Sequence, residues 1–212
     1  MSEWFNRDIF SKEASKLNLK FTNKQLDQFQ FFGDEIIRVN EMMNLTRVPH
    51  EDFQVRHFLD SLSVVSAGKF QDGDTVLDIG TGAGLPGVPL AITFPNVSFT
   101  LIDSLNKRIK FLEEVINKAN IKNVKVFHRR AEDEPERFNW IVVRAVTNLE
   151  TLTKYFNRLL KKDGVGVAIK GGRVEEELNI LPLVLREKLS VKEVVVPGDA
   201  ERRVNHLVVF KG

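Results

Sequence analysis

Four glycines follow a short apolar segment early in the second third of the chain. The stretch reads VLDIGTGAGLPGVPLAI from position 76, with glycines at 80, 82, 84 and 87. A glycine-rich turn after a strand lets the backbone approach a nucleotide closely. The turn alone suits two classes of ligand, a dinucleotide such as NAD or S-adenosylmethionine.

The residues around the turn favour S-adenosylmethionine. Asp78 precedes the first glycine, and its carboxylate suits a ligand with a cationic sulfonium and ammonium group but would repel a pyrophosphate. Pro86 and Pro89 remove backbone N–H donors where the next helix starts and a pyrophosphate would need them. Residues 82–87 do satisfy G-x-G-x-x-G, but that pattern is weak by itself. We therefore interpret D-x-G-x-G-x-G at 78–84 as an S-adenosylmethionine motif.

A second carboxylate, Asp103, ends the next apolar run and is placed to accept both ribose hydroxyls. Arg144 follows a later apolar run, and open α/β sheets bind ligands at that end of their strands. We predict a positioning role for Arg144, with a purely structural role in its loop as the alternative. The cofactor-binding residues predicted from the motifs are Asp78, Gly80, Gly82, Gly84 and Asp103.

The elements that position these residues alternate along the chain. Predicted strands cover 75–80, 98–103, 124–128, 140–145, 164–170, 191–196 and 206–210. Helical stretches over 107–119 and 149–160 separate earlier strands, which predicts a parallel sheet covered on both faces. The last two strands have only a loop around Pro197 between them, so we predict an antiparallel hairpin.

Residues 1–70 predict a helical extension packed on the sheet, with the main domain over 71–212. Thr22 and Gln25 fit a capping box, and apolar residues spaced by three or four then predict a helix as far as Met43. A second helix is predicted over 51–65. Its single His57 is more often structural than a ligand in such a position, and Arg56 and Asp60 are spaced to pair on one helix face.

Composition excludes several classes of function. The 212 residues suffice for one α/β domain with a small extension, and no apolar run is long enough for a membrane helix. The chain has no cysteine, and its four histidines lie in no metal-ligand spacing, so we predict no disulfide and no metal site. The N-terminal residues lack an apolar signal core, which favours the cytoplasm. A monomer is the default expectation.

Positive charge is concentrated near the predicted ligand-binding edge. Residues 101–130 hold eight Lys or Arg against three Asp or Glu, whereas residues 1–70 hold nine against ten. A basic patch of this kind is typical of a surface for an anionic polymer, although a solvated helix face gives the same pattern. The candidates for this surface are Lys107, Arg108, Arg129, Arg130 and Lys170.

Taken together, these motifs resemble the bacterial RsmG (GidB) family. The matching segments are 44–46 (NLT), 56–61 (RHFLDS), 78–87 (DIGTGAGLPG), 101–105 (LIDSL), 107–108 (KR) and 144–145 (RA). The resemblance implies a class I S-adenosylmethionine-dependent methyltransferase fold, Rossmann-like, with a mostly parallel seven-stranded sheet, a terminal antiparallel hairpin and a helical N-terminal extension. It also implies methylation of N7 of a guanine in 16S ribosomal RNA of the small subunit.

The resemblance assigns further roles by position. Gly80 and Leu85 would contact the methionine part of the cofactor, Ala131 and Glu132 the adenine, and Arg144 the junction of cofactor and substrate. Asn44 and the pair 60–61 would hold the helical extension to the glycine turn. Family members often carry Arg directly before the final strand, where this chain has Asn205. Arg202 and Arg203 are then the candidates for the C-terminal RNA contact.

The chemistry of the expected target explains what the chain lacks. Guanine N7 carries a lone pair and no proton, so its methylation needs alignment and no general base. The Asn/Asp-Pro-Pro-aromatic turn typical of exocyclic-amine methyltransferases is replaced here by residues 143–146 (VRAV), and a pyrimidine C5 target would need a cysteine. A small-molecule methyltransferase and a non-catalytic RNA-associated cofactor-binding protein remain the alternatives.

Overall fold

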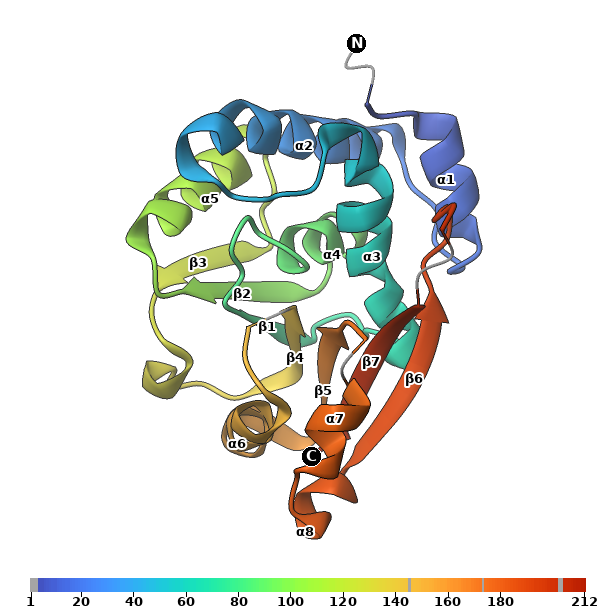
Figure 1. Cartoon of the computed structure of the whole chain (residues 1–212). Coiled ribbons are helices and arrows are strands. Elements are labelled where there is room, and N and C mark those ends of the chain that lie inside the picture. Colours follow the sequence, from blue (N-terminus) through green and yellow to red (C-terminus); the bar gives the residue numbers. More distant parts are fainter. Residues whose placement is uncertain (1–3, 145, 173, 202–203) are drawn as a thin grey trace.

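The alternating apolar runs form one seven-stranded sheet (Figure 1). The computed structural model describes residues 4–144, 146–172, 174–201 and 204–212. The strands are β1 (Thr75–Ile79), β2 (Ser98–Asp103), β3 (Val124–His128), β4 (Phe138–Arg144), β5 (Leu160–Lys170), β6 (Leu189–Val195) and β7 (Val204–Lys211). Their order is β3-β2-β1-β4-β5-β7-β6, with β1 to β5 parallel and β7 antiparallel to both neighbours. The predicted class I sheet and terminal hairpin are confirmed.

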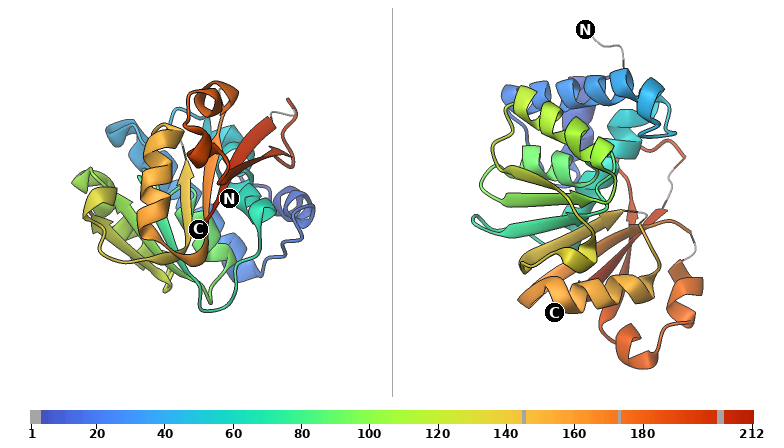
Figure 2. Two further views of the ribbon diagram at one scale, coloured as in Figure 1. Left: turned by 90° about the horizontal axis from the view of Figure 1, so that it is seen from below. Right: turned by 90° about the vertical axis from the view of Figure 1, so that its left-hand side faces the viewer.

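Helices cover both faces of this sheet (Figure 2). In chain order they are α1 (Arg7–Ser15), α2 (Asn23–Met43), α3 (Asp60–Leu62), α4 (Gly87–Thr93), α5 (Asn106–Lys118), α6 (Leu149–Leu159), α7 (Val174–Asn179) and α8 (Leu183–Arg186). In Figure 1, α2 to α5 lie above the sheet, while α6 and α7 lie below it. None of the helices in the described segments is long and apolar enough to cross a membrane.

Alternation along the strands produces two hydrophobic cores. Val76 and Val142 face the side of α4 and α5, whereas Leu77 and Val143 face the side of α6. Successive side chains of a strand point to opposite faces, so a parallel strand buried on both sides is apolar at nearly every position. This is why the strand runs read as continuous apolar segments in the sequence.

The N-terminal extension shares the core of the α4 and α5 side. Thr22 caps α2 with a capping box, as the spacing predicts. The Gln25 side chain donates to Ile92 O at 2.8 Å, and the Gln28 side chain donates to Ala119 O at 3.0 Å. These contacts join α2 to the ends of α4 and α5, so the extension forms a third layer over those helices.

The helix predicted over 51–65 forms as short pieces of different pitch. A 3₁₀ turn (His50–Asp52), a π-helical stretch (Gln54–Leu59), α3 and another 3₁₀ turn (Ser63–Ala67) follow one another. Ser61 Oγ donates to His57 O at 2.5 Å, and Ser63 Oγ donates to Asp60 O at 2.6 Å. Hydroxyls that bond back to carbonyls of the preceding turn bend helices. The spacing of apolar residues does not reveal these bonds from the serine hydroxyls to the backbone carbonyls.

The strand register brings three chain segments together at one edge. Ile79 pairs with Ile102 on one side and with Val143 on the other. The carboxyl ends of β1, β2 and β4 therefore meet, and the loops that follow them enclose the same space. Open α/β sheets bind their ligands at this position.

Candidate cofactor and substrate site

The turn after β1 depends on its glycines. Gly80, Gly82 and Gly84 have φ of 65°, 61° and 94°, values that residues with a Cβ rarely adopt. A Cβ on Gly80 would also lie 2.7 Å from Val146 Cγ2. The turn is fastened to β2 by Thr81 N, which donates to Ile102 O at 3.0 Å. The backbone at Gly80 is therefore close to a neighbouring loop and needs the space that a side chain would take.

The Asp78 side chain stabilises this turn from its buried side. Its Oδ2 accepts from Thr81 Oγ1 at 2.7 Å and from Gly87 N at 2.9 Å. The side chain is fully buried, its Oδ1 has no hydrogen-bond partner in the described part of the chain, and burial raises its pKa to about 7. The sequence interpretation gave Asp78 a direct contact with a cationic ligand, whereas the structure places it beneath the turn and outside the cavities described below.

Asp103 lies at the end of β2 and is almost completely buried. Its Oδ2 accepts from Gly82 N at 2.9 Å and from Arg108 Nη1 at 3.1 Å, while its Oδ1 accepts from Leu105 N at 2.9 Å. Three donors hold the carboxylate in one orientation. Since a carboxylate offers about four acceptor sites, some capacity remains for hydroxyl donors.

Two adjoining cavities open beside the turn. One of about 210 Å³ lies toward β3 and α6, and one of about 370 Å³ lies toward the N-terminal extension. Both are lined by Gly80, Asp103, Ser104 and Val146. Asp103 therefore lies between the two, with space on either side.

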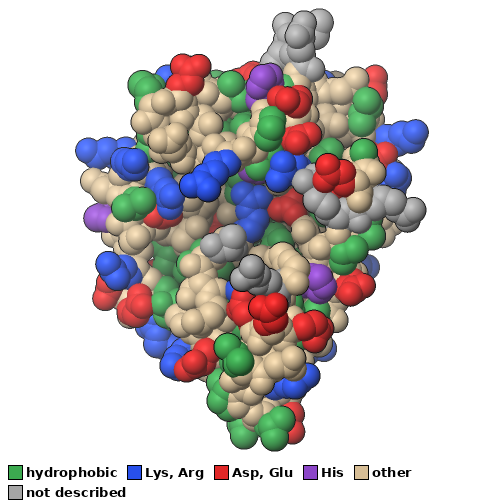
Figure 3. All heavy atoms as spheres, in the orientation of Figure 1, with side chains coloured by type: hydrophobic (Ala, Val, Ile, Leu, Met, Phe, Trp, Pro, Cys, Tyr) green, Lys and Arg blue, Asp and Glu red, His purple; other side chains and the backbone are tan. Residues whose placement is uncertain are grey.

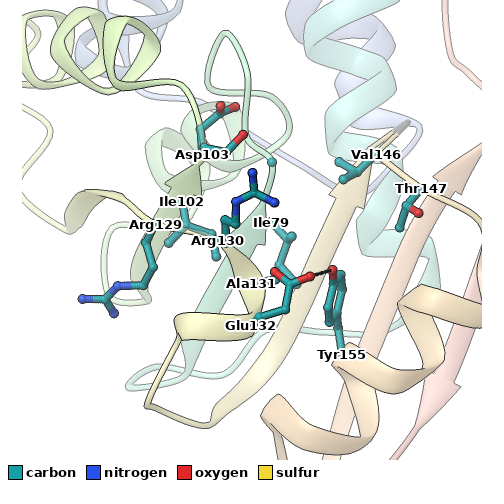
Figure 4. Close-up of a pocket in the computed structure, with 12 residues that line it drawn as sticks. Ile79, Ile102, Asp103, Arg129, Arg130, Ala131, Glu132, Val146, Thr147 and Tyr155 are labelled. Carbon is teal, nitrogen blue, oxygen red and sulfur yellow. Dashed lines mark hydrogen bonds between the residues drawn. The ribbon is translucent and has the colours of Figure 1, made fainter.

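The smaller cavity is bounded by residues from the loop after β3 (Figure 4). Ala131 is buried in its wall, and the Glu132 carboxylate accepts from Tyr155 Oη at 2.5 Å. Figure 4 shows Arg130 pointing toward Asp103 across this space, while Arg129 points away from it. The larger cavity carries Thr81, Gly82, Leu85 and Arg108 along the glycine turn.

This arrangement fits S-adenosylmethionine, which is long and has a ribose near its middle. The buried Asp103 carboxylate lies at the join of the two cavities, where a ribose would need acceptors. Ala131 and Glu132 line one end, Leu85 lines the other, and Gly80 lines both cavities. The order of the lining residues is the order that the resemblance implies for adenine, ribose and methionine.

A third cavity of about 360 Å³ adjoins the larger one, and Thr46 and Arg144 line both. Arg144 Nη1 donates to Asp60 Oδ2 at 3.0 Å and to Arg56 O at 3.4 Å. The Asn205 side-chain amide donates to Asp60 Oδ1. The resemblance tied residue 60 to the glycine turn, whereas these bonds tie it to the ends of β4 and β7.

The remaining polar residues of the extension have structural partners. His57 is buried, with Nε2 2.8 Å from Thr46 Oγ1, and burial together with the charge of Arg144 lowers its pKa to about 3. Arg56 lies 3.5 Å from Asp52, so the expected pair with residue 60 does not form. Asn44 ends α2 in a left-handed conformation, which turns the following Leu45 and Thr46 toward the larger cavity.

Comparison with known proteins identifies the family of this chain. The model of the family described as rRNA small subunit methyltransferase G matches residues 25–205. A relative of that description from Lactobacillus helveticus is 38% identical over 96% of this chain and 90% of its own length. Another, from Lachnoclostridium phytofermentans, is 42% identical over 82% of this chain and 74% of its own. The chain belongs to the rRNA small subunit methyltransferase G family. It is accordingly an S-adenosylmethionine-dependent rRNA methyltransferase.

Solved structures share its fold. An S-adenosylmethionine-dependent methyltransferase from Aquifex aeolicus has a TM-score of 0.58 at 19% identity, covering 84% of this chain and 97% of its own. A precorrin-6y C5,15-methyltransferase from Geobacter metallireducens has a TM-score of 0.54 at 15% identity, covering 72% and 87%. At these identities the likeness concerns the class I methyltransferase fold alone.

Some of the predicted RNA-binding residues bond to other groups of the protein, whereas others are exposed. Arg108 pairs with Asp103, and Arg129 lies 2.8 Å from Glu134 with its guanidinium 4.9 Å from the Phe127 ring centroid. Lys170 Nζ bonds to Thr147 O at 2.5 Å and to the Glu177 carboxylate at 2.9 Å, so protein acceptors surround its ammonium. Lys107 and Arg130 are exposed. Arg202 and Arg203 lie outside the described residues.

The molecular surface, viewed in the orientation of Figure 1, has a hollow at its middle (Figure 3). Lys and Arg side chains gather along the upper edge of this hollow, with acidic side chains among them. Within the described ranges, no three His, Asp or Glu side chains are grouped as metal ligands. The face thus combines a cavity with an incomplete basic rim.

Sequence reasoning did not single out several lining residues of this methyltransferase. Thr81, Ser104 and Val146 border these two cavities, and Tyr155 reaches the smaller one from α6 and donates to Glu132. Thr81 and Ser104 lie inside quoted motifs and could have been found there. Tyr155 had no local signal, because its role depends on how α6 packs against the loop after β3.

Proposed function

We propose that this methyltransferase methylates N7 of a guanine in 16S rRNA of the small ribosomal subunit, as a cytoplasmic monomer. The relatives are named ribosomal RNA small subunit methyltransferases, which supports this class of substrate. The observation that carries the proposal is the position of Arg144, at the boundary between the larger cofactor cavity and the third cavity. A base entering the third cavity would meet this guanidinium beside the methyl donor.

Each proposed cofactor contact uses a residue of the two adjoining cavities. Asp103 would accept the ribose hydroxyls, with Gly82 N and Leu105 N keeping its carboxylate oriented. Ala131 and Glu132 would contact the adenine, and Gly80 and Leu85 the methionine part. When bound, S-adenosylmethionine would supply a methyl group on a sulfonium. A neutral nucleophile can attack this methyl carbon without a proton transfer, and the neutral thioether leaves.

The side chains near this junction suit a nucleophile that needs no deprotonation. The carboxylate that lines the larger cavity, Asp103, is held by three donors, and buried His57 stays neutral at physiological pH because of its low pKa. Guanine N7 has a lone pair and no proton, so alignment and exclusion of water are sufficient. Arg144 could donate to the neighbouring O6 and so fix the base.

The basic rim would hold the RNA backbone. Lys107 and Arg130 are the exposed members of this rim, and phosphate contacts give position and affinity without reading sequence. If about four phosphates of a single-stranded segment are contacted, the slope of log affinity against log salt should lie near −3. Arg130→Gln should make this slope shallower. Lys24→Gln, a matched change beside Pro95 at the opposite edge of the sheet, should not.

The deciding experiment is label transfer. Methyl-labelled S-adenosylmethionine is incubated with purified protein and either naked small-subunit rRNA or whole small subunits, and the RNA is digested to nucleosides. We expect the label in 7-methylguanosine. Label in another nucleoside, or none with either substrate, refutes the proposed function. Using both substrates also reveals which of the two the enzyme prefers.

A further inference from the structure

The third cavity has features that the methyl-transfer step alone does not require. Its volume of about 360 Å³ lies within the range of about 300–1,000 Å³ found for small-ligand sites. Val48, Val55 and Val196 form apolar walls, and Asp60, Arg144 and Asn205 supply polar groups. Thr46, Arg56, His57 and Asp199 also line it, so most of its lining residues are polar, and converging polar groups fix the orientation of a bound ligand.

An ion pair dominates the polar end of this cavity. Arg144 Nη1 lies 3.0 Å from Asp60 Oδ2, and their side chains are 21% and 12% exposed. Burying such a pair adds little net stability, because the desolvation of both charges offsets their attraction. The pair therefore calls for an explanation other than stability. Asp60 Oδ2 accepts from Arg144 and Asp60 Oδ1 accepts from Asn205, so neighbouring donors fix the orientation of a carboxylate that lines the cavity.

The order of groups around guanine matches the order of residues in the cavities. Going around the base, N7 is followed by the O6 acceptor and then by the N1–H donor. N7 must face the larger cavity, where the methyl donor would lie. Arg144, which both cavities share, then meets O6, and Asp60, which lines the third cavity only, meets N1–H. Unstacked RNA bases are read on these edges.

We propose, resting on the proposed function, that Asp60 is the specificity residue of this enzyme. Its carboxylate accepts N1–H of the target guanine while Arg144 donates to O6. Adenine presents a donor at position 6 and an acceptor at N1, so it would face Arg144 and Asp60 with both groups mismatched. Sites built to hydrogen-bond a particular group reject analogues that lack it by factors of about 10⁴.

The first test changes the RNA and leaves the protein intact. Wild-type enzyme is given small-subunit RNA with 1-methylguanosine, inosine or guanosine at the target position. The 1-methyl group blocks N1–H but leaves N7 and O6 in place, so we expect a loss of at least 100-fold in kcat/KM. Inosine keeps O6 and N1–H, and its rate should stay within about tenfold of guanosine. Equal rates on 1-methylguanosine and guanosine overturn the proposal.

The second test changes the residue. Asp60→Asn should lower kcat/KM on guanine RNA at least 100-fold, while the Kd for S-adenosylmethionine stays within twofold by calorimetry. Because an amide can also donate, this variant should raise the rate on 2-aminopurine relative to guanine at least tenfold. Asp72→Asn, an exposed aspartate bonded to Asn96, is the matched control and should change neither quantity. An equal loss on both bases would mean a structural role and overturn the proposal.

The outcomes separate this inference from the function on which it rests. If wild-type enzyme forms no 7-methylguanosine, the proposed function fails. If it does, and blocking N1–H or replacing Asp60 leaves the preference for guanine intact, only the role of Asp60 fails.

Discussion

Replacing Asp78 by asparagine should change how stability depends on pH. The Asp78 side chain is fully buried under the glycine turn, and burial raises its pKa from 3.8 to about 7, against the opposing hydrogen bonds from Thr81 and Gly87. The folded protein therefore binds a proton at pH values where the unfolded chain has released it. The contribution of this carboxyl to the free energy of unfolding must then fall as pH rises from about 4 to about 7.

The size of the effect follows from the two pKa values. One pKa unit corresponds to about 1.4 kcal/mol, and most of the interval between 3.8 and about 7 lies above pH 5. Between pH 5 and pH 8 the contribution of this carboxyl should fall by about 2–3 kcal/mol. In Asp78→Asn the amide oxygen can keep the bonds to Thr81 Oγ1 and Gly87 N without a titratable charge. Any cost of its unpaired NH₂ group is an offset independent of pH.

The assay is urea unfolding followed by circular dichroism at pH 5, 6, 7 and 8, with linear extrapolation to water. The stability of Asp78→Asn relative to wild type should rise by about 2–3 kcal/mol across this range. Asp72→Asn serves as the exposed control and should give a nearly flat difference. A flat difference for Asp78→Asn as well would refute the raised pKa of this buried carboxyl.

Three further changes test other parts of the site. Because the folded pKa of His57 is about 3 against an ordinary 6.5, the contribution of His57 to the free energy of unfolding should fall by about 2 kcal/mol between pH 8 and pH 5, so the stability of His57→Gln relative to wild type should rise by about 2 kcal/mol over this interval in the same unfolding assay. Asp103→Ala should raise the Kd for S-adenosylmethionine by about 10- to 100-fold in calorimetry, since it removes a buried acceptor; a wild-type Kd would contradict the ribose assignment. Gly80→Ala should weaken the same binding at least tenfold because its Cβ meets Val146, whereas Gly73→Ala, also at positive φ but with open space around it, should cost stability alone.

The fold was predictable because its signals are local or simply periodic. Each strand is a short apolar run, and the capping box at Thr22 marks the start of α2 within a few residues of sequence. The antiparallel hairpin followed from the absence of a helix between the last two runs. The helix over 51–65 was predicted less well, because Ser61 and Ser63 bond to carbonyls of the preceding turn and change the helical pitch. The spacing of apolar residues is nearly the same for one regular helix and for the short pieces observed, so it does not distinguish them.

The candidate site was predictable only where a motif carries its own geometry. The positive φ values of Gly80, Gly82 and Gly84 explain why the turn needs glycines, so the glycine pattern in the sequence predicts the turn. The partners of Arg144 could not be derived in this way. Asp60 is 84 residues away from it along the chain, and Asn205 reaches the same carboxylate from 145 residues away. The register of β4, β5 and β7 brings Arg144 and Asn205 to one edge of the sheet, and the packing of α3 places Asp60 beside them.

We expect Asp78 to disfavour a dinucleotide by a different route from the one that the sequence suggested. Its carboxylate was expected to attract the cationic part of the ligand directly. In the structure it accepts from Gly87 N at the start of α4, the kind of position where a helix would otherwise offer N–H groups to a phosphate. The Asp78 side chain therefore already occupies a backbone donor that a pyrophosphate could use at this helix start. We expect a dinucleotide to bind poorly for this reason, whereas a ligand without a phosphate does not need that donor.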